Sequence, residues 1–317
     1  MRIALITPYG AESQNGNWHT AARWAGFLRD AGHLVEIATH WNGEPADMMI
    51  ALHARRSALS IHAFAAWQPD SPLVVVLTGT DLYRDIRTDE DAKASLRLAT
   101  RLVVLQEKGL DELALALHPK TRVIYQSAPD ITRQPPTPSV FKVLVIAHLR
   151  EEKDPFRAAL ASACLPEHSN IRITHLGRAL SPEMEDTART MQAQNPHWQW
   201  LGGVSHDEAI AHLSRANLLV VSSLMEGGAN VICEALAADV PVIASDIPGN
   251  IGMLGQDYPG YYPVRDAQSL AQALSRAEND PGFYADLRAH CRGRRLRMTP
   301  ELEALEVRQL VTEFKTV

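Results

Sequence analysis

The chain consists of two successive series of short apolar segments that alternate with amphipathic stretches, interrupted once by a proline-rich run. Helical periodicity lies between the apolar segments, beginning with residues 18–31, and Gly32 ends that first helix. Strands that alternate with helices form parallel sheets covered by helices, so the sequence predicts an α/β fold. The expected strands are residues 3–6, 34–38, 48–52, 73–77, 101–105, 122–125, 142–147, 172–176, 199–201, 218–221 and 241–244.

The proline-rich run divides the chain. Residues 128–139 hold four prolines, which are excluded from the interior of a helix and from a central strand. A length of 317 residues is enough for two domains. We therefore predict a Rossmann-like domain over residues 1–128, a linker over 129–139 and a second Rossmann-like domain over 140–298. The last segment, residues 299–317, contains a helix near residues 301–315.

Composition excludes several classes of protein. The net charge is −6 and the basic residues are scattered, which gives no nucleic-acid footprint. The three cysteines form neither a metal spacing nor a disulfide framework, so we expect a cytoplasmic location. The apolar start is too short for a signal peptide, and no run is long enough for an integral membrane segment. The oligomeric state is not constrained.

One basic cluster occurs near the C-terminus. Two interpretations remain open for it, namely docking on an anionic membrane surface or a solvated helix end where cations favour the dipole. Its members are Arg288, His290, Arg292, Arg294, Arg295 and Arg297.

The most informative motif follows the expected strand at 218–221 and opens a helix over 231–238. It reads Glu226-Gly227-Gly228-Ala229-Asn230. Glycines before a helix expose backbone N–H groups at the positive end of its dipole, which favours a phosphate. Glu234 lies about one turn further on, where a carboxylate suits a ribose diol. The motif therefore predicts a nucleotide-sugar site, and the alternative is a glycine turn between two solvated glutamates.

Two other strand ends hold polar residues suited to the same ligand. The loop before the first helix lacks the dinucleotide pattern G-x-G-x-x-G, so no dinucleotide site is expected there, and a flexible turn at Gly16 and Asn17 stays open. The strand at 142–147 is followed by His148, Arg150 and Lys153.

The first domain offers an anion site. Residues 52–58 (LHARRSA) and 77–85 (LTGTDLYRD) follow two expected strands, and ligands bind outside the carboxyl ends of such strands. The pair Arg55 and Arg56, followed by Ser57 at a helix start, suits a small oxyanion. The alternative is a surface salt-bridge pair.

Glu226 and Glu234 are separated by seven residues, and in this spacing the segment resembles the donor site of family-4 retaining glycosyltransferases. The resemblance implies the GT-B fold, in which two Rossmann-like domains with parallel sheets face a cleft and a C-terminal helix packs back on the first domain. It also implies that Lys153 offsets the charge of the leaving diphosphate. That family has an arginine where this chain has His148, which leaves open whether His148 or Arg150 contacts the diphosphate.

A closer resemblance extends over nearly the whole chain. Residues 52–58 (LHARRSA), 77–85 (LTGTDLYRD), 148–155 (HLREEKDP) and 257–264 (DYPGYYPV) look like those of the selenosugar synthases of selenoneine biosynthesis. Such enzymes transfer a sugar from UDP-N-acetylglucosamine or UDP-glucose to selenophosphate and form a carbon–selenium bond. The resemblance fixes neither the sugar nor the anomeric configuration of the product.

The resemblance suggests roles for the residues singled out above. Lys153, His148 and Glu226 are the catalytic candidates. The donor candidates are Gly16, Asn17, Arg150, Gly227, Gly228, Ala229, Asn230 and Glu234, and the acceptor candidates are Arg55, Arg56, Ser57, Thr80 and Asp81. Selenophosphate is a strong nucleophile, so no general base is needed, and Asp81 is expected to orient rather than attack. We expect no obligatory metal and no cofactor.

Three other functions remain open. The first is an ordinary glycosyltransferase with a carbohydrate or lipid acceptor. The second is an NDP-sugar epimerase, which needs no acceptor. The third is a nucleotide-sugar-binding regulator, which binds UDP and turns over no acceptor.

Overall fold

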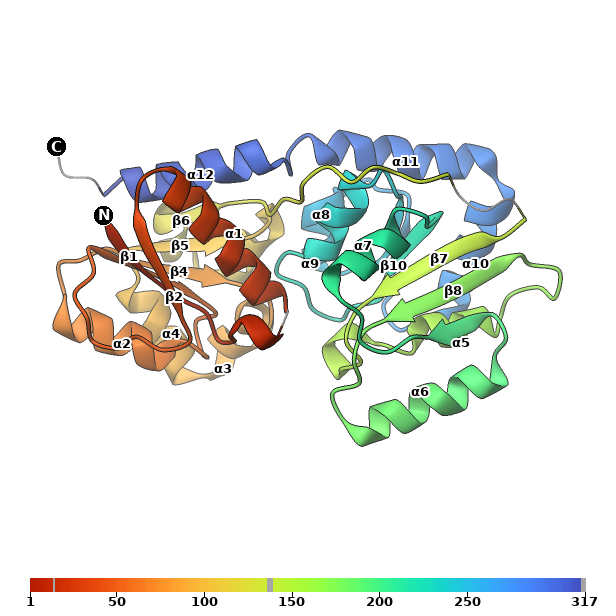
Figure 1. Ribbon diagram of the computed structural model, residues 1–317, viewed down its shortest axis with the longest axis horizontal. Helices are drawn as coiled ribbons and strands as arrows, with labels where there is room; N and C mark the ends of the chain where they lie inside the picture. The colour runs from red at the N-terminus through yellow and green to blue at the C-terminus, as the bar shows by residue number, and fades with distance from the viewer. Residues whose placement is uncertain (14, 136–138, 315–317) are drawn as a thin grey trace. The chain divides into compact units, whose positions relative to one another are not determined.

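The computed structural model describes residues 1–13, 15–135 and 139–314. These residues form two compact units (Figure 1). The first unit consists of Met1–Ser127, Glu226–Ala229 and the described part of Arg297–Val317. The second consists of the described residues of Ala128–Met225 and of Asn230–Leu296. Because Glu226–Ala229 belongs to the first unit, the chain returns to that unit inside the region predicted as the second domain.

The first unit is a six-stranded sheet with helices on its faces. All its strands are parallel, in the order β2-β1-β3-β4-β5-β6. Its main elements are β1 (Arg2–Ile6), α1 (Gly16–Asp30), β2 (Leu34–Ala38), β3 (Met48–Leu52), α2 (Ala58–Trp67), β4 (Leu73–Leu77), α3 (Ile86–Thr88), α4 (Glu90–Leu98), β5 (Arg101–Val104), β6 (Thr121–Val123) and α12 (Pro300–Thr312). Shorter turns are η1 (Ala11–Ser13), the π-helical η2 (Asp81–Asp85), η3 (Glu107–Glu112) and η4 (Leu115–Lys120).

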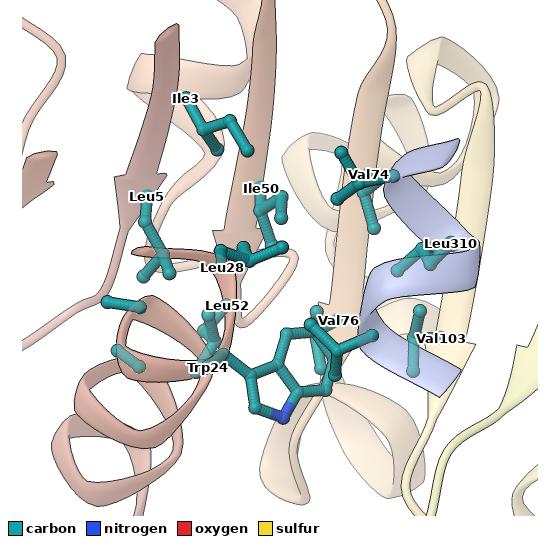
Figure 2. Close-up of a cluster of buried hydrophobic side chains, with 14 of the residues drawn as sticks. Ile3, Leu5, Trp24, Leu28, Ile50, Leu52, Val74, Val76, Val103 and Leu310 are labelled. Carbon is teal, nitrogen blue, oxygen red and sulfur yellow. The ribbon is translucent and has the colours of Figure 1, made fainter. Parts of the chain in front are cut away.

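The central strands of this sheet are apolar throughout, because helices cover both faces. β3 and β4 read MMIAL and LVVVL, and every residue in them is buried. Figure 2 shows one side of this core, where Trp24 and Leu28 of α1 lie over strand residues such as Leu5 and Ile50. Leu310 of α12 belongs to the same cluster. The C-terminal helix is therefore part of the core of the first unit.

A buried carboxylate fixes α12 to α1. Glu303 accepts hydrogen bonds from Arg23 at 2.7 and 3.0 Å and from the indole N–H of Trp24 at 2.8 Å. The hydroxyl of Ser127, the last residue of the first segment of the unit, donates to the same carboxylate at 2.5 Å. Each carboxylate oxygen therefore has partners, as a buried charge requires.

The second unit is also a six-stranded parallel sheet, in the order β12-β11-β10-β7-β8-β9. This is the order of a doubly wound nucleotide-binding fold. Its elements are β7 (Phe141–Ile146), η5 (Glu151–Lys153), α5 (Arg157–Ser162), β8 (Ile171–Leu176), α6 (Pro182–Gln194), β9 (Trp198–Trp200), α7 (His206–Leu213), β10 (Leu218–Val221), α8 (Asn230–Ala237), β11 (Val242–Ser245), α9 (Pro248–Leu254), β12 (Tyr261–Tyr262), α10 (Ala267–Asn279) and α11 (Pro281–Arg295).

The prediction of two Rossmann-like α/β domains is confirmed. Every predicted strand is present within one residue at its start, and β2, β3, β4 and β10 have the predicted bounds. The two-residue strand β12 was not predicted, because its pattern is too short to show a period.

The predicted linker is not a separate element. Residues 129–135 pack on the second unit, where the N–H of Ile131 donates to the carbonyl of Ala237 at 3.3 Å. The N–H of Gln134 likewise donates to the carbonyl of Ser214 at 2.8 Å. Prolines prevent secondary structure here, yet the N–H groups of Ile131 and Gln134 find carbonyl partners. Residues 136–138 of the predicted linker, like 315–317 of the last segment, lie outside the described residues.

The basic cluster of α11 is engaged within the second unit. Arg288 and Arg292 both bond to the carboxylate of Asp239, the latter through two contacts of 2.7 Å. Arg294 donates to the carbonyls of Met253 and Gly252 at 2.7 and 2.6 Å. These three arginines therefore make contacts that stabilise the second unit. Neither interpretation of the sequence, a membrane-docking surface or a solvated helix end, included this role. Among the residues that the structure describes, no helix combines the length and apolarity that a membrane crossing needs.

Candidate active site

Most of the predicted site residues follow strands at which the strand order reverses in each sheet, whereas Thr80 and Asp81 follow the neighbouring strand β4. In the first sheet the reversal lies between β1 and β3, and in the second between β7 and β10. Ligands of open α/β sheets bind outside the carboxyl ends of the strands at these points. All four loops there contain predicted donor or acceptor contacts, and the loop after β10 contains the Glu226 motif.

The loop after β1 leads into the N-terminus of α1. Gly16 and Asn17 are the first two residues of this helix, and Asn15 caps it by accepting the N–H of Trp18 at 3.1 Å. The cap satisfies one of the orphan donors of the first turn. Gly16 and Asn17 therefore stand at the positive end of a 15-residue helix. Residue 14 of the predicted loop lies outside the described residues.

The loops after β3 and β4 meet through His53 and Thr80. His53 Nε2 lies 3.0 Å from Thr80 Oγ1, and His53 Nδ1 accepts the backbone N–H of Arg56 at 3.3 Å. The second contact places the imidazole proton on Nε2, so His53 donates to Thr80. His53 also has a φ of 72°, an uncommon conformation for a non-glycine residue and one that concentrates at functional sites.

Asp81 holds these two loops together. One carboxylate oxygen accepts the N–H groups of Thr78 and Gly79, each at 2.9 Å, and the other accepts the N–H of Ala54 at 2.9 Å. The residue is fully buried. Asp81 therefore positions the loops and has no direct access to a ligand, which corrects its inclusion among the acceptor contacts.

Ser57 and the arginine pair have partners within the first unit. The buried hydroxyl of Ser57 donates to the carbonyl of Leu52 at 2.6 Å, so it too has a structural role. Arg55 donates to Asp85 at 2.7 Å, and the guanidinium of Arg56 lies 5.0 Å from the ring centroid of Tyr9. Although burial opposes it, hydrogen bonds from Arg55 and Arg84 keep the pKa of Asp85 below its usual range.

The segment Glu226–Ala229 lies against the ends of β4 and β5. A Cβ added to Gly227 would stand 2.4 Å from the carbonyl carbon of Thr78, and one added to Gly228 would stand 2.6 Å from Cβ of Leu105. Both positions therefore require glycine because neighbouring atoms leave no room for a Cβ. Glu226 is buried.

Tyr83 lies close to this segment. Its hydroxyl accepts a hydrogen bond from Gln106 at 2.9 Å. Burial, and after it nearby carboxylates that include Glu226, raise the pKa of Tyr83 well above its usual range. The phenol is therefore neutral and available as a hydrogen-bond donor.

In the second unit, His148 stands among cations. It follows β7, and its Nδ1 accepts the backbone N–H of Arg178 at 3.2 Å, which leaves the proton on Nε2. Burial lowers the pKa of His148, and the charges of three neighbours lower it further. These neighbours are Arg178, Arg150 and Lys153. The arrangement is a neutral imidazole donor surrounded by positive charge.

The loop that holds Arg150 and Lys153 is fixed through its backbone. The N–H of Lys153 donates to the carbonyl of Arg150 at 3.0 Å, and the carbonyl of Lys153 accepts the hydroxyl of Ser222 at 2.9 Å. The N–H of Leu224 donates to the carbonyl of Glu152 at 2.8 Å. This loop is thereby bonded to the loop that follows β10.

Glu234 lies in the second turn of α8, which begins at Asn230. Its carboxylate is 3.9 Å from Nδ1 of His206, the first residue of α7, and its side chain is mostly buried. Asn230 and Ala229 stand where the chain passes from the first unit to the second. No group of metal-ligating side chains large enough to hold a metal ion occurs in the described residues.

Four site residues were not predicted. His53 was only part of a quoted motif, and its left-handed backbone carries no sequence signal. Tyr83 was likewise only part of a quoted motif in the first unit, and Arg178 and His206 lie beside predicted residues of the second unit. The position of Arg178 follows from the pairing of β7 with β8. The pairing continues beyond these strands to Leu149 and Ala179, so the preceding residues, His148 and Arg178, also lie opposite each other.

Residues 130–294, more than half of the chain, match the protein family described as glycosyl transferases group 1. The chain belongs to this family. A relative of this glycosyltransferase, glycosyltransferase 1 domain-containing protein 1 of Xenopus tropicalis, is 22% identical over 89% of this chain and 88% of its own. The putative teichuronic acid biosynthesis glycosyltransferase TuaC of Bacillus subtilis is 35% identical over 25% of this chain and 20% of its own.

Solved structures show the same fold. Alr3699/HepE of Anabaena, crystallised in complex with UDP-glucose, superimposes with a TM-score of 0.78 at 15% identity, covering 99% of this chain and 100% of its own. The sucrose-phosphate synthase of Thermosynechococcus elongatus gives a TM-score of 0.77 at 16% identity, covering 99% and 98%. These similarities show that this glycosyltransferase has the GT-B fold.

Proposed function

We propose that this glycosyltransferase moves a sugar from UDP-N-acetylglucosamine or UDP-glucose to selenophosphate, in selenoneine biosynthesis. The sequence motifs that resemble selenosugar synthases support the acceptor. The UDP-glucose complex of HepE and the complex of the pneumococcal GtfA with UDP and GlcNAc support a UDP-sugar donor, since both proteins share the fold.

Selenophosphate is favoured over a hydroxyl acceptor because two aspartate carboxylates near the expected acceptor position already accept hydrogen bonds within the first unit. These are Asp81 and Asp85, which follow β4, where an acceptor is expected. Asp81 accepts three backbone N–H groups, and Asp85 accepts hydrogen bonds from Arg55 and Arg84. Neither is placed to remove a proton from a sugar hydroxyl. Selenophosphate is already an anionic nucleophile and needs no such base.

On the acceptor side we assign the anion contacts to neutral donors and to cations. The hydroxyl of Thr80 is free to donate, because it receives the Nε2–H of His53. Asp85 holds the guanidinium of Arg55 in one orientation, and Arg56 is exposed beside Tyr9. A fixed guanidinium recognises a phosphate more selectively than a mobile cation.

On the donor side we assign the ribose to Glu234 and the diphosphate to Lys153, Arg150 and His148. Gly16 and Asn17, at the N-terminus of α1, and the Gly227-Gly228-Ala229-Asn230 segment are further diphosphate contacts in this proposal. Glu226 orients the sugar hydroxyls. Cations that face the leaving group gain interaction energy as its charge grows in the transition state.

The reaction is a substitution at the anomeric carbon. A selenium lone pair forms the carbon–selenium bond while the bond between that carbon and the diphosphate oxygen breaks, and UDP leaves with the electron pair. The first product is a sugar joined through selenium to phosphate. This step needs neither a redox partner nor a cofactor, and we propose that no metal is obligatory. We infer a cytoplasmic setting, because the three cysteines are odd in number and far apart in the sequence.

The test is mass spectrometry of reactions that pair each UDP-sugar with selenophosphate, thiophosphate or phosphate. We expect a selenium-containing sugar, as the selenophosphate adduct or the selenol formed by its hydrolysis, together with UDP. Turnover only with a carbohydrate or lipid acceptor would instead identify an ordinary glycosyltransferase. Conversion of the UDP-sugar without any acceptor would identify an epimerase, and saturable UDP binding without turnover would identify a regulator.

A further inference from the structure

Arg178 is built into the second unit beside His148. Its backbone N–H donates to His148 Nδ1 at 3.2 Å, and its carbonyl accepts the N–H of Leu149 at 2.9 Å. The loops after β7 and β8 are thus hydrogen-bonded to each other at the carboxyl ends of their strands. The backbone N–H of Arg178 therefore also fixes the tautomer of His148, whose proton lies on Nε2.

The side chain of Arg178 passes over a glycine that has no room for a Cβ. A Cβ on Gly203 would stand 2.2 Å from Cγ of Arg178 and 3.0 Å from its Cδ. Gly203 does not have a positive φ, so space and not backbone conformation is what limits this position. The absence of a side chain at Gly203 therefore leaves the space that the stem of Arg178 occupies, although Arg178 as a whole is exposed.

The charges around His148 are of one sign. Burial lowers the pKa of this histidine, and Arg178 is the strongest of the three cations that lower it further. A guanidinium held beside a neutral imidazole donor, with two more cations near it, favours a multiply charged anion.

We propose that Arg178 binds the diphosphate of the sugar donor, as the guanidinium partner of the His148 imidazole. The inference rests on the proposed function and deepens it. The planar guanidinium donates two hydrogen bonds to phosphate oxygens, while Nε2–H of His148 donates a third. When the bond to the sugar breaks, the added negative charge on the diphosphate develops next to these donors.

The test is calorimetry with UDP and with uridine on the full chain. Arg178→Ala should raise the Kd for UDP about 10- to 150-fold, because a charge-assisted contact is lost, and should leave uridine binding unchanged. Arg178→Lys should recover only part of the loss, since it keeps the charge and loses the fork. The matched control is Arg172→Ala on β8, the strand that precedes Arg178, because the Arg172 guanidinium bonds to His197 and to nearby carbonyls. It should bind UDP like the wild type.

Gly203→Ala provides a second test that leaves the arginine in the chain. The added methyl should displace the stem of Arg178, so the variant should lose UDP affinity as Arg178→Ala does. It should have no further effect when combined with Arg178→Ala. If Gly203→Ala does not fold, the UDP affinities of the Arg178 variants alone test the inference. A wild type that does not bind UDP would overturn the proposed function. A wild type that binds UDP, with an Arg178→Ala variant of equal affinity, would overturn only this inference.

Discussion

His53 Nε2 donates to the hydroxyl of Thr80 across 3.0 Å, from a residue held in a left-handed backbone conformation. The proton of the Thr80 hydroxyl is then directed away from His53, toward any anion bound at the ends of β3 and β4. The strained backbone of His53 is maintained by Asp81, which ties the adjacent loops together.

Thr80→Val should therefore raise the KM for selenophosphate about 10- to 150-fold, the loss expected for one hydrogen bond to a charged group. Thr80→Ser keeps the hydroxyl and should stay within a few-fold of the wild type. UDP affinity, measured by calorimetry, should be the same in both variants. Wild-type selenophosphate kinetics in Thr80→Val would move the anion contact to the arginine pair.

Glu234→Ala should weaken UDP binding by about 1.5–3 kcal/mol, because a charge-assisted contact to the ribose is removed. Calorimetry with UDP measures the effect, and uridine should show a similar loss since the contact is to the sugar. Glu183→Ala, at the exposed start of α6, is the control and should bind normally. Unchanged affinity in a folded Glu234→Ala variant would show that this carboxylate has another role.

Lys153→Ala should lower kcat more than it raises the KM for the donor, because the leaving diphosphate gains charge in the transition state. The backbone of Lys153 is bonded to Arg150 and Ser222, so the loop should keep its position without the side chain. Steady-state and single-turnover kinetics separate the two parameters. A variant with normal kcat and only a raised donor KM would contradict the leaving-group role.

His175 makes the second unit sensitive to acid. The residue is fully buried, its Nε2 bonds to the carbonyl of Ala147 at 2.9 Å, and burial lowers its pKa to about 4. The unfolded chain takes up a proton near the ordinary value of 6.5, whereas the folded chain does not. Stability is therefore fully present above about pH 6.5 and is lost as the pH falls toward about 4.

Urea unfolding should show a loss of about 2 kcal/mol from this group between about pH 7 and about pH 5. His175→Gln keeps a donor for the Ala147 carbonyl and should remove that part of the pH dependence. An identical pH profile in the two proteins would show that the buried imidazole is not the source.

The fold could be predicted from sequence to a greater extent than the site. β3 and β4 are buried on both faces, so their runs MMIAL and LVVVL stand out from the flanking polar residues. The partners of the site residues come from distant parts of the chain. Asp85 restrains Arg55 from 30 positions away, and only the packing of two strand ends brings them together.

The glycine motif shows the same limit. A glycine pair before a helix predicts a phosphate site, and this expectation stays a prediction. The close contacts of Gly227 with Thr78 and of Gly228 with Leu105 give the glycines a second reason that no local pattern contains. The segment Glu226–Ala229 joins the first unit because of tertiary packing, which sequence periodicity does not report.

The proposed reaction forms a bond between selenium and the anomeric carbon of a UDP-sugar. The most direct measurement is selenium NMR of the product formed from selenophosphate and a UDP-sugar that is isotopically labelled at the anomeric carbon. We expect a one-bond selenium–carbon coupling and release of one UDP for each product. A product whose anomeric carbon is bonded to oxygen, or transfer to carbohydrate or lipid acceptors with none to selenophosphate, would contradict it.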